Sequence, residues 1–147
     1  MKRTVALCVA AIGWAASGSA QPAASGSLTG PFVLVQANHH AAYLLSGMQK
    51  GAEPDAVEAW LWTVYGDHAL AIATTYRCAR ETLETHRSET YLKGAQTEGG
   101  PMLNPPVQPN PLNGFGASLR LACDANGVAS ARTFPTLAEA LAYTTAL

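Results

Sequence analysis

Apolar and polar residues alternate along the middle of the chain with the period of two that is typical of β-strands. The clearest run is 57–65 (VEAWLWTVY), which is rich in aromatic and β-branched residues. Trp60 and Trp62 fall on one face of this predicted strand and Leu61 falls on the other. Because both faces carry large apolar side chains, we expect both to be covered.

The N-terminal side of this strand holds two shorter predicted strands. Residues 32–35 and 42–45 are apolar and are separated by an Asn-His-His turn. Residues 46–55 contain two glycines and a proline, and we expect a loop there.

The pattern after the Gly66-Asp67 turn is more ambiguous. Alanines in 69–81 are compatible with a helix, whereas Thr74, Thr75 and Tyr76 favour a strand, and the preceding turn favours a hairpin. We therefore predict a strand, followed by a second polar strand over 83–96 that Gly99-Gly100-Pro101 ends. The next segment, 101–111, which we name the Pro-rich connection, holds five of the nine prolines. It can be neither a helix nor a central strand, so we expect an extended connection.

Helical spacing appears only in the C-terminal third of the chain. Residues 112–123 predict a helix with Asn110 or Asn113 as its N-cap, although Gly114 and Gly116 weaken it. A final helix is predicted where Thr136 and Glu139 form a capping box before an apolar run. Strands first and helices last predict the α+β class: an antiparallel sheet of about five to six strands with the C-terminal helices packed on one face.

The N-terminus has the pattern of a signal peptide. Lys2 and Arg3 precede an apolar stretch at 4–16, and small residues at 18–20 offer a cleavage site before Gln21. The alternative is a retained membrane anchor, but the stretch is shorter than the roughly 20 residues that span a bilayer. Cys8 lies inside this stretch rather than at its end, so it is not expected to carry a lipid.

Cleavage would leave a flexible leader at 21–30 and a single domain at 31–147, in the periplasm or secreted. Without Lys2 and Arg3 the chain has seven basic and ten acidic residues, a net charge of −3. This charge argues against nucleic-acid partners and against electrostatic attachment to anionic lipid. No later apolar run is long enough to be an integral membrane span.

Two cysteines, Cys78 and Cys123, remain after cleavage. Because exported bacterial proteins fold in an oxidising compartment, we predict a disulfide between them. The alternative, a metal site or a catalytic thiol, would need a nearby second cysteine or a suitably spaced histidine, and neither is present.

Other candidate chemistry is sparse. His39 and His40 are adjacent on a predicted turn and would point to opposite sides, so we predict no metal site. The acidic pairs Glu53/Asp55 and Glu81/Glu84 lie in a loop and on a polar strand, where solvated charge explains them better than acid–base catalysis. No nucleophile-elbow, Gly-rich or zinc-protease motif occurs, so we predict neither an enzyme nor a cofactor.

Aromatic residues offer one further candidate site. Trp60, Trp62, Tyr76 and Tyr91 form a candidate binding face. In a covered sheet most such residues belong to the core, so we expect at most one or two of them at a partly exposed surface.

Two segments resemble the surface-adhesin protein E-like family of small exported bacterial domains. They are YRCARETLETHRSETYLKG from Tyr76 and NPLNGFGASLRLAC from Asn110. The resemblance covers roughly residues 32–124. The matching positions are Trp60, Trp62, Cys78, Ala79, Tyr91, Gly94 and residues 111–123.

The resemblance implies an antiparallel sheet of about six strands, a helix tied to it by Cys78 and Cys123, and a non-enzymatic protein. The family is named for a lipid-anchored adhesin that binds host matrix proteins. This chain departs from that pattern, since it lacks a lipid-attachment cysteine, a tryptophan within 101–111 and a basic charge. We therefore expect an exported binding or structural module with a protein partner at the cell envelope. The alternative is a periplasmic enzyme inhibitor or small enzyme that uses residues 80–93 or the Pro-rich connection.

Overall fold

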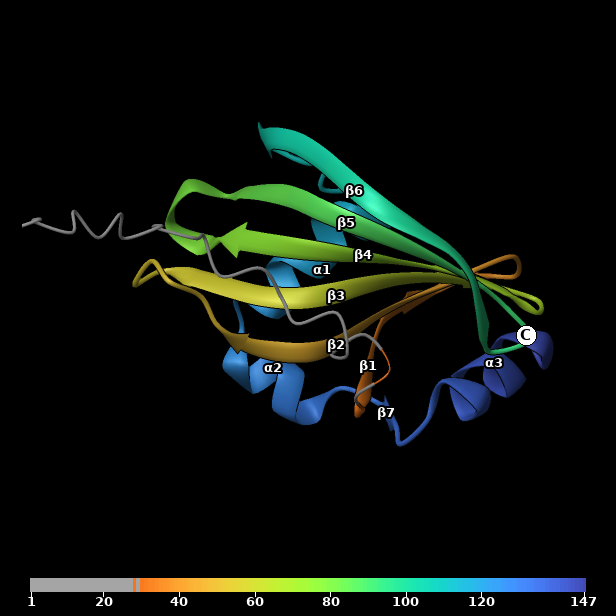
Figure 1. Ribbon diagram of the computed structural model, residues 1–147. Coiled ribbons are helices and arrows are strands. Elements are labelled where there is room, and N and C mark those ends of the chain that lie inside the picture. Colours follow the sequence, from red (N-terminus) through yellow and green to blue (C-terminus); the bar gives the residue numbers. More distant parts are fainter. Residues whose placement is uncertain (1–27, 29) are drawn as a thin grey trace, which may run out of the picture.

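The structure, a computed structural model, describes residue 28 and residues 30–147. The predicted signal peptide at 1–20 and most of the predicted leader lie outside the described residues. The described part forms an antiparallel sheet of seven strands in the order β6-β5-β4-β3-β2-β1-β7 (Figure 1). The strands are β1 (Phe32–Ala37), β2 (Ala42–Lys50), β3 (Ala56–Tyr65), β4 (His68–Arg77), β5 (Thr82–Leu92), β6 (Ala95–Val107) and β7 (Thr133–Phe134).

Within the described residues, three α-helices and one 3₁₀ turn accompany the sheet: η2 (Cys78–Arg80), α1 (Gly114–Ala122), α2 (Ala125–Ser130) and α3 (Leu137–Thr145). Asn113 is the N-cap of α1, and its Oδ1 accepts a hydrogen bond from the Gly116 amide at 3.0 Å. The predicted cap of α3 is confirmed, since Thr136 Oγ1 accepts from the Glu139 amide at 3.3 Å. None of the helices in the described part is both long and apolar enough to cross a membrane.

Both faces of the sheet carry a hydrophobic core, as the alternation in β3 predicts. Trp60, Trp62 and Val64 share one core with Leu137 and Ala140 of α3, and we call this side the α3 face. The register places these large side chains beside small ones on β4, with Trp60 opposite Ala73 and Trp62 opposite Ala71.

The opposite side, the α1 face, is covered by α1, which lies behind the central strands in Figure 1. Ala59 and Leu61 of β3 pack there with Leu119 and Ala122 of α1. The two long helices therefore lie on opposite faces, whereas the sequence predicted both on one face. The difference follows from β7, which lies between α1 and α3 in the sequence and pairs with β1 at the edge of the sheet. The chain passes from one face to the other at this edge.

The sheet also has more strands than the five to six predicted. The polar run at 83–96 is divided by a tight turn at Lys93 and Gly94, both at positive φ, into β5 and β6. β2 continues to Lys50 through part of the predicted loop at 46–55. The short elements α2 and β7 were not predicted.

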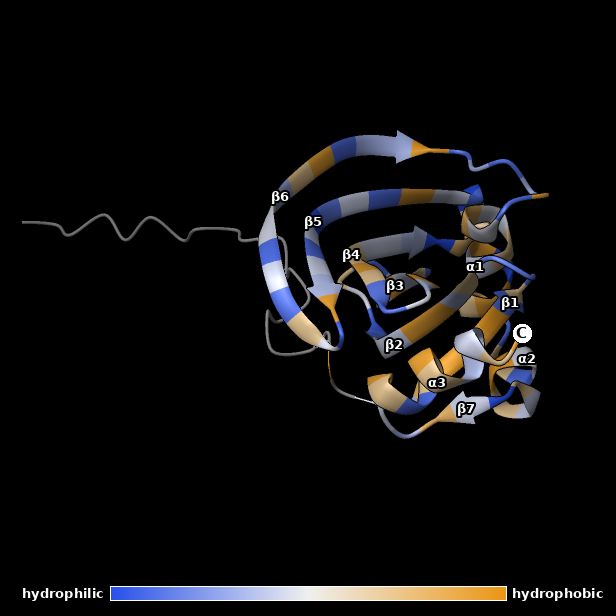
Figure 2. Cartoon of the chain, turned by 90° about the vertical axis from the view of Figure 1, so that its right-hand side faces the viewer, coloured by the Kyte–Doolittle hydropathy of each residue, from blue (hydrophilic) through white to orange (hydrophobic). Residues whose placement is uncertain are grey.

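β6 runs into the Pro-rich connection as far as Val107 although it contains Pro101, Pro105 and Pro106. A strand tolerates proline where no neighbour needs its missing amide, which is the case along an edge. Figure 2 shows the sheet strongly curled, with β6 outermost and coloured mostly hydrophilic or neutral. Nearly all β6 side chains are exposed.

Candidate functional site

The four aromatic residues predicted as a binding face are all buried, and they divide between the two faces. Trp60, Trp62 and Tyr91 lie in the core of the α3 face, and Tyr76 lies in that of the α1 face. Trp62 Nε1 donates to Ser46 Oγ at 2.9 Å, and its ring lies 5.0 Å from that of Tyr91. All four side chains thus contribute to packing, and they do not share one exposed surface.

Tyr76 connects the sheet to α1. Its hydroxyl donates to Ser118 Oγ at 3.1 Å, and Ser118 in turn donates to the Phe115 carbonyl at 2.7 Å. Burial raises the pKa of the Tyr76 phenol well above its ordinary value, although the hydrogen bond to Ser118 opposes the shift. The phenol therefore stays neutral and acts as a structural donor.

Glu53, Asp55 and Glu84, which the sequence predicts as solvated charges, hold the turn that carries Cys78. Arg77 bridges Glu53 (Nε–Oε2, 3.2 Å) and Glu84 (Nη1–Oε2, 2.7 Å). Both hydrogen bonds raise the pKa of the Arg77 guanidinium, and the bond to Glu84 contributes most. The Asp55 side chain accepts a hydrogen bond from the Ala79 amide at 3.3 Å, and the Asp55 carbonyl accepts one from the Cys78 amide at 3.1 Å. Three of the four carboxylates therefore have structural partners.

Two buried carboxylates were missed by sequence reasoning. Glu58 accepts from Gln49 Nε2 at 2.9 Å, and Glu89 accepts from the Tyr91 hydroxyl at 2.7 Å and from Arg87 Nε at 3.2 Å. The signal that could have found Glu58 is its period-two position, which it shares with Trp60 on the α3 face.

The histidines do not gather into a metal site. His39 and His40 lie in an exposed turn, His68 contacts Asp67 at 2.7 Å, and the ring of His86 lies 2.7 Å from Thr75 Oγ1. Across residue 28 and residues 30–147, no three histidine, cysteine or acidic side chains are grouped closely enough to hold a metal ion.

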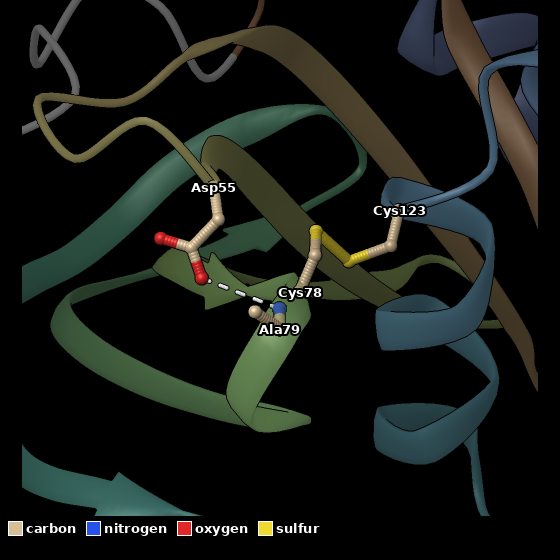
Figure 3. Close-up of a disulfide and its surroundings, with 4 residues drawn as sticks. All are labelled: Asp55, Cys78, Ala79 and Cys123. Atoms are coloured by element: carbon tan, nitrogen blue, oxygen red, sulfur yellow. Dashed lines mark hydrogen bonds between the residues drawn. A yellow bond between two sulfur atoms is a disulfide. The ribbon is translucent and has the colours of Figure 1, made fainter.

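The predicted disulfide is confirmed. Cys78, the first residue of η2 directly after β4, is bonded to Cys123 at the C-cap of α1, and their Cα atoms lie 5.6 Å apart (Figure 3). The Asp55 side chain lies beside the bridge on the Ala79 amide, which fixes the turn from which Cys78 projects. The bridge therefore connects two rigid points.

A cavity of about 650 Å³, which we name the disulfide cavity, opens where α1, the bridge and the Pro-rich connection meet. Its walls combine apolar surface with one acidic and one basic side chain. They are formed by Cys78, Glu81, Gln108, Pro109, Asn110, Pro111, Gly116, Leu119, Arg120 and Cys123. A second, smaller cavity of about 350 Å³ lies beyond Pro109, between α1 and the ends of β5 and β6.

Exposed apolar side chains accompany these cavities. Leu103 is 73% exposed, Val107 47% and Leu112 87%, and all three lie on β6 or directly after the Pro-rich connection. Sequence reasoning missed this cluster, because exposure depends on which strand becomes the sheet edge.

The outer edge of β6 is the other open feature. β6 pairs with β5 alone, and within the described residues no strand pairs with its outer side. The opposite edge, β7, has only two residues. The sheet thus presents one long free edge.

No protein-family model, no curated protein and no solved structure matches the chain.

Proposed function

We propose that this chain is an exported, non-enzymatic module that binds a protein at the cell envelope. The resemblance to the surface-adhesin protein E-like family implies such a role. The observation that carries the proposal is the free outer edge of β6, a strand of thirteen residues with almost every side chain exposed.

A free edge of this kind binds proteins through the main chain. An extended segment of a partner adds as a further strand, so that backbone amides and carbonyls supply the affinity. Because proline has no amide hydrogen, Pro101, Pro105 and Pro106 reduce pairing along the second half of β6. Residues 95–100 contain no proline, and they form the stretch of the edge best suited to a partner strand.

A lysine at position 100 tests the proposal. A Cβ added at Gly100 meets no atom within 4 Å, so Gly100→Lys should fold normally while placing a charge on the edge, where lysine discourages strand pairing. The matched control is Ala129→Lys, an exposed position on α2.

Two probes are used. One is a set of immobilised extracellular matrix proteins, and the other is the solubilised cell envelope of the bacterium that produces the chain. Wild type and Ala129→Lys should retain the same partner, and Gly100→Lys should retain much less. Hydrogen exchange with the bound partner should slow at the amides of residues 95–100. Equal retention by all three proteins, or unchanged exchange on β6, would refute binding at this edge.

A further inference from the structure

Leu112 is the most exposed large apolar side chain among the described residues, and the backbone that carries it is fixed. Asn110 Oδ1 accepts from the Leu112 amide at 2.9 Å, and the Asn110 carbonyl accepts from the Asn113 amide at 3.2 Å. Arg120 Nη1 donates to the Pro111 carbonyl at 2.6 Å. Since the turn is held on both sides, the backbone at Leu112 is displayed in one position and loses little freedom when the side chain is bound.

The disulfide cavity lies directly beside this displayed leucine, because Pro111 and Asn110 form part of its wall. Its apolar surface comes from the bridge, Leu119 and the prolines, and its volume of about 650 Å³ exceeds what one leucine side chain fills. A projecting apolar side chain and a cavity with apolar and charged walls therefore occur next to each other on one surface.

The charges of the cavity are also self-complementary. Glu81 and Arg120 line the same cavity and have opposite signs. In a two-fold dimer each patch meets its own copy, so that a residue i contacting j requires j to contact i. Such an arrangement would bring Glu81 of each copy toward Arg120 of the other.

From these features we propose that the chain forms a symmetric dimer in which Leu112 of each copy enters the disulfide cavity of the other. A second copy would bury the exposed leucine, occupy part of the cavity and pair Glu81 with Arg120 at the same time. The surface is separate from residues 95–100, so dimer formation and the proposed partner binding at the edge of β6 are independent.

Sedimentation velocity of the exported, oxidised protein across a concentration series tests this proposal. Wild type should show a dimer fraction that rises with concentration. Leu112→Asp should raise the dissociation constant by about tenfold or more, as expected when a central apolar anchor is lost. Leu103→Asp, a comparably exposed leucine outside the cavity, should leave the constant unchanged.

A charge reversal gives a second measurement. Glu81→Lys should also weaken the dimer, and raised salt should weaken the wild type in the same direction, because screening reduces attraction between exposed charges. Each variant is accepted only if its unfolding midpoint matches that of wild type.

Three results would overturn the proposal. They are a monomer at every concentration, a dimer that Leu112→Asp leaves intact, and a dimer that Gly100→Lys disrupts. The last result would assign self-association to the edge of β6. A dimer that withstands Gly100→Lys while partner binding is lost would support both proposals separately.

Discussion

At the scale of single residues, two glycines set how closely α1 approaches the rest of the molecule. A Cβ at Gly114 would overlap the Tyr43 ring, and one at Gly116 would overlap the Asn110 carbonyl and the Pro111 Cα. A ring can rotate away, whereas the backbone at 110–111 is held by the hydrogen bonds of the Leu112 turn. The residues that weaken α1 as an isolated helix therefore permit its packing.

We expect Gly116→Ala to destabilise the protein. Alanine is the better helix former by about 1 kcal/mol, but forcing a methyl group against fixed backbone typically costs about 1–3 kcal/mol. Urea unfolding should show a lower midpoint with an unchanged slope. Gly100→Ala, whose Cβ meets nothing within 4 Å, is the control and should stay close to wild type. A gain of stability in Gly116→Ala would show that the contact with Asn110 and Pro111 yields easily.

At the scale of elements, the sequence predicts those whose signals are local. Period-two alternation placed β3 and assigned Trp60 and Leu61 to opposite faces, and the capping box placed the start of α3. β6 was not predicted, because a strand that contains proline is permitted only at the edge of a sheet. Which strand forms the edge is a property of the whole sheet. The faces covered by α1 and α3 likewise depend on β7 and not on either helix alone.

The candidate sites divide in the same way. Cysteine count and predicted compartment were sufficient for the pair Cys78 and Cys123. The disulfide cavity, the exposure of Leu112 and the free edge of β6 could not be predicted, since each forms between segments distant in sequence.

The bridge is one of three attachments that hold α1 on the sheet. The others are the hydrogen bond from Tyr76 to Ser118 and the packing of Leu119 and Ala122 on the α1 face. The bridge acts at the C-terminal end of the helix, just before α2, whose six residues include none that is buried. Its loss should therefore affect the end of α1 and α2 more than the sheet.

We expect the variant with Cys78→Ser and Cys123→Ser to lose about 2–5 kcal/mol, the usual effect of removing a native disulfide from a small exported domain. Limited proteolysis should cut first between residues 108 and 130, while amides of β3 and β4 keep their hydrogen-exchange protection. Ala79→Ser, an exposed neighbour of Cys78, is the control and should behave as wild type. Unchanged stability and an unchanged cleavage pattern would show that the other two attachments suffice.

At the scale of the whole molecule, the N-terminal pattern and the bridge make one joint prediction. A chain that is exported with cleavage before Gln21 loses Cys8 and reaches a compartment in which Cys78 and Cys123 can be oxidised. A chain kept in the cytoplasm stays reduced. Processing, thiol state and the order of the C-terminal region should therefore change together.

Expression of the full chain in a bacterium with a periplasm, beside a form lacking residues 2–20, tests this link. Mass spectrometry of the exported protein should find Gln21 at the N-terminus, in free or cyclised form, and thiol titration after denaturation should find no reactive cysteine. The cytoplasmic form should show two thiols, from Cys78 and Cys123, and faster proteolysis near α1 and α2. Exported Cys78→Ser is the control, because its unpaired Cys123 should titrate as one thiol.

An intact Met1 would contradict cleavage, and the retained Cys8 would then titrate as one thiol beside an intact bridge. Two thiols in correctly processed protein would instead contradict oxidation, so the two halves of the prediction fail separately.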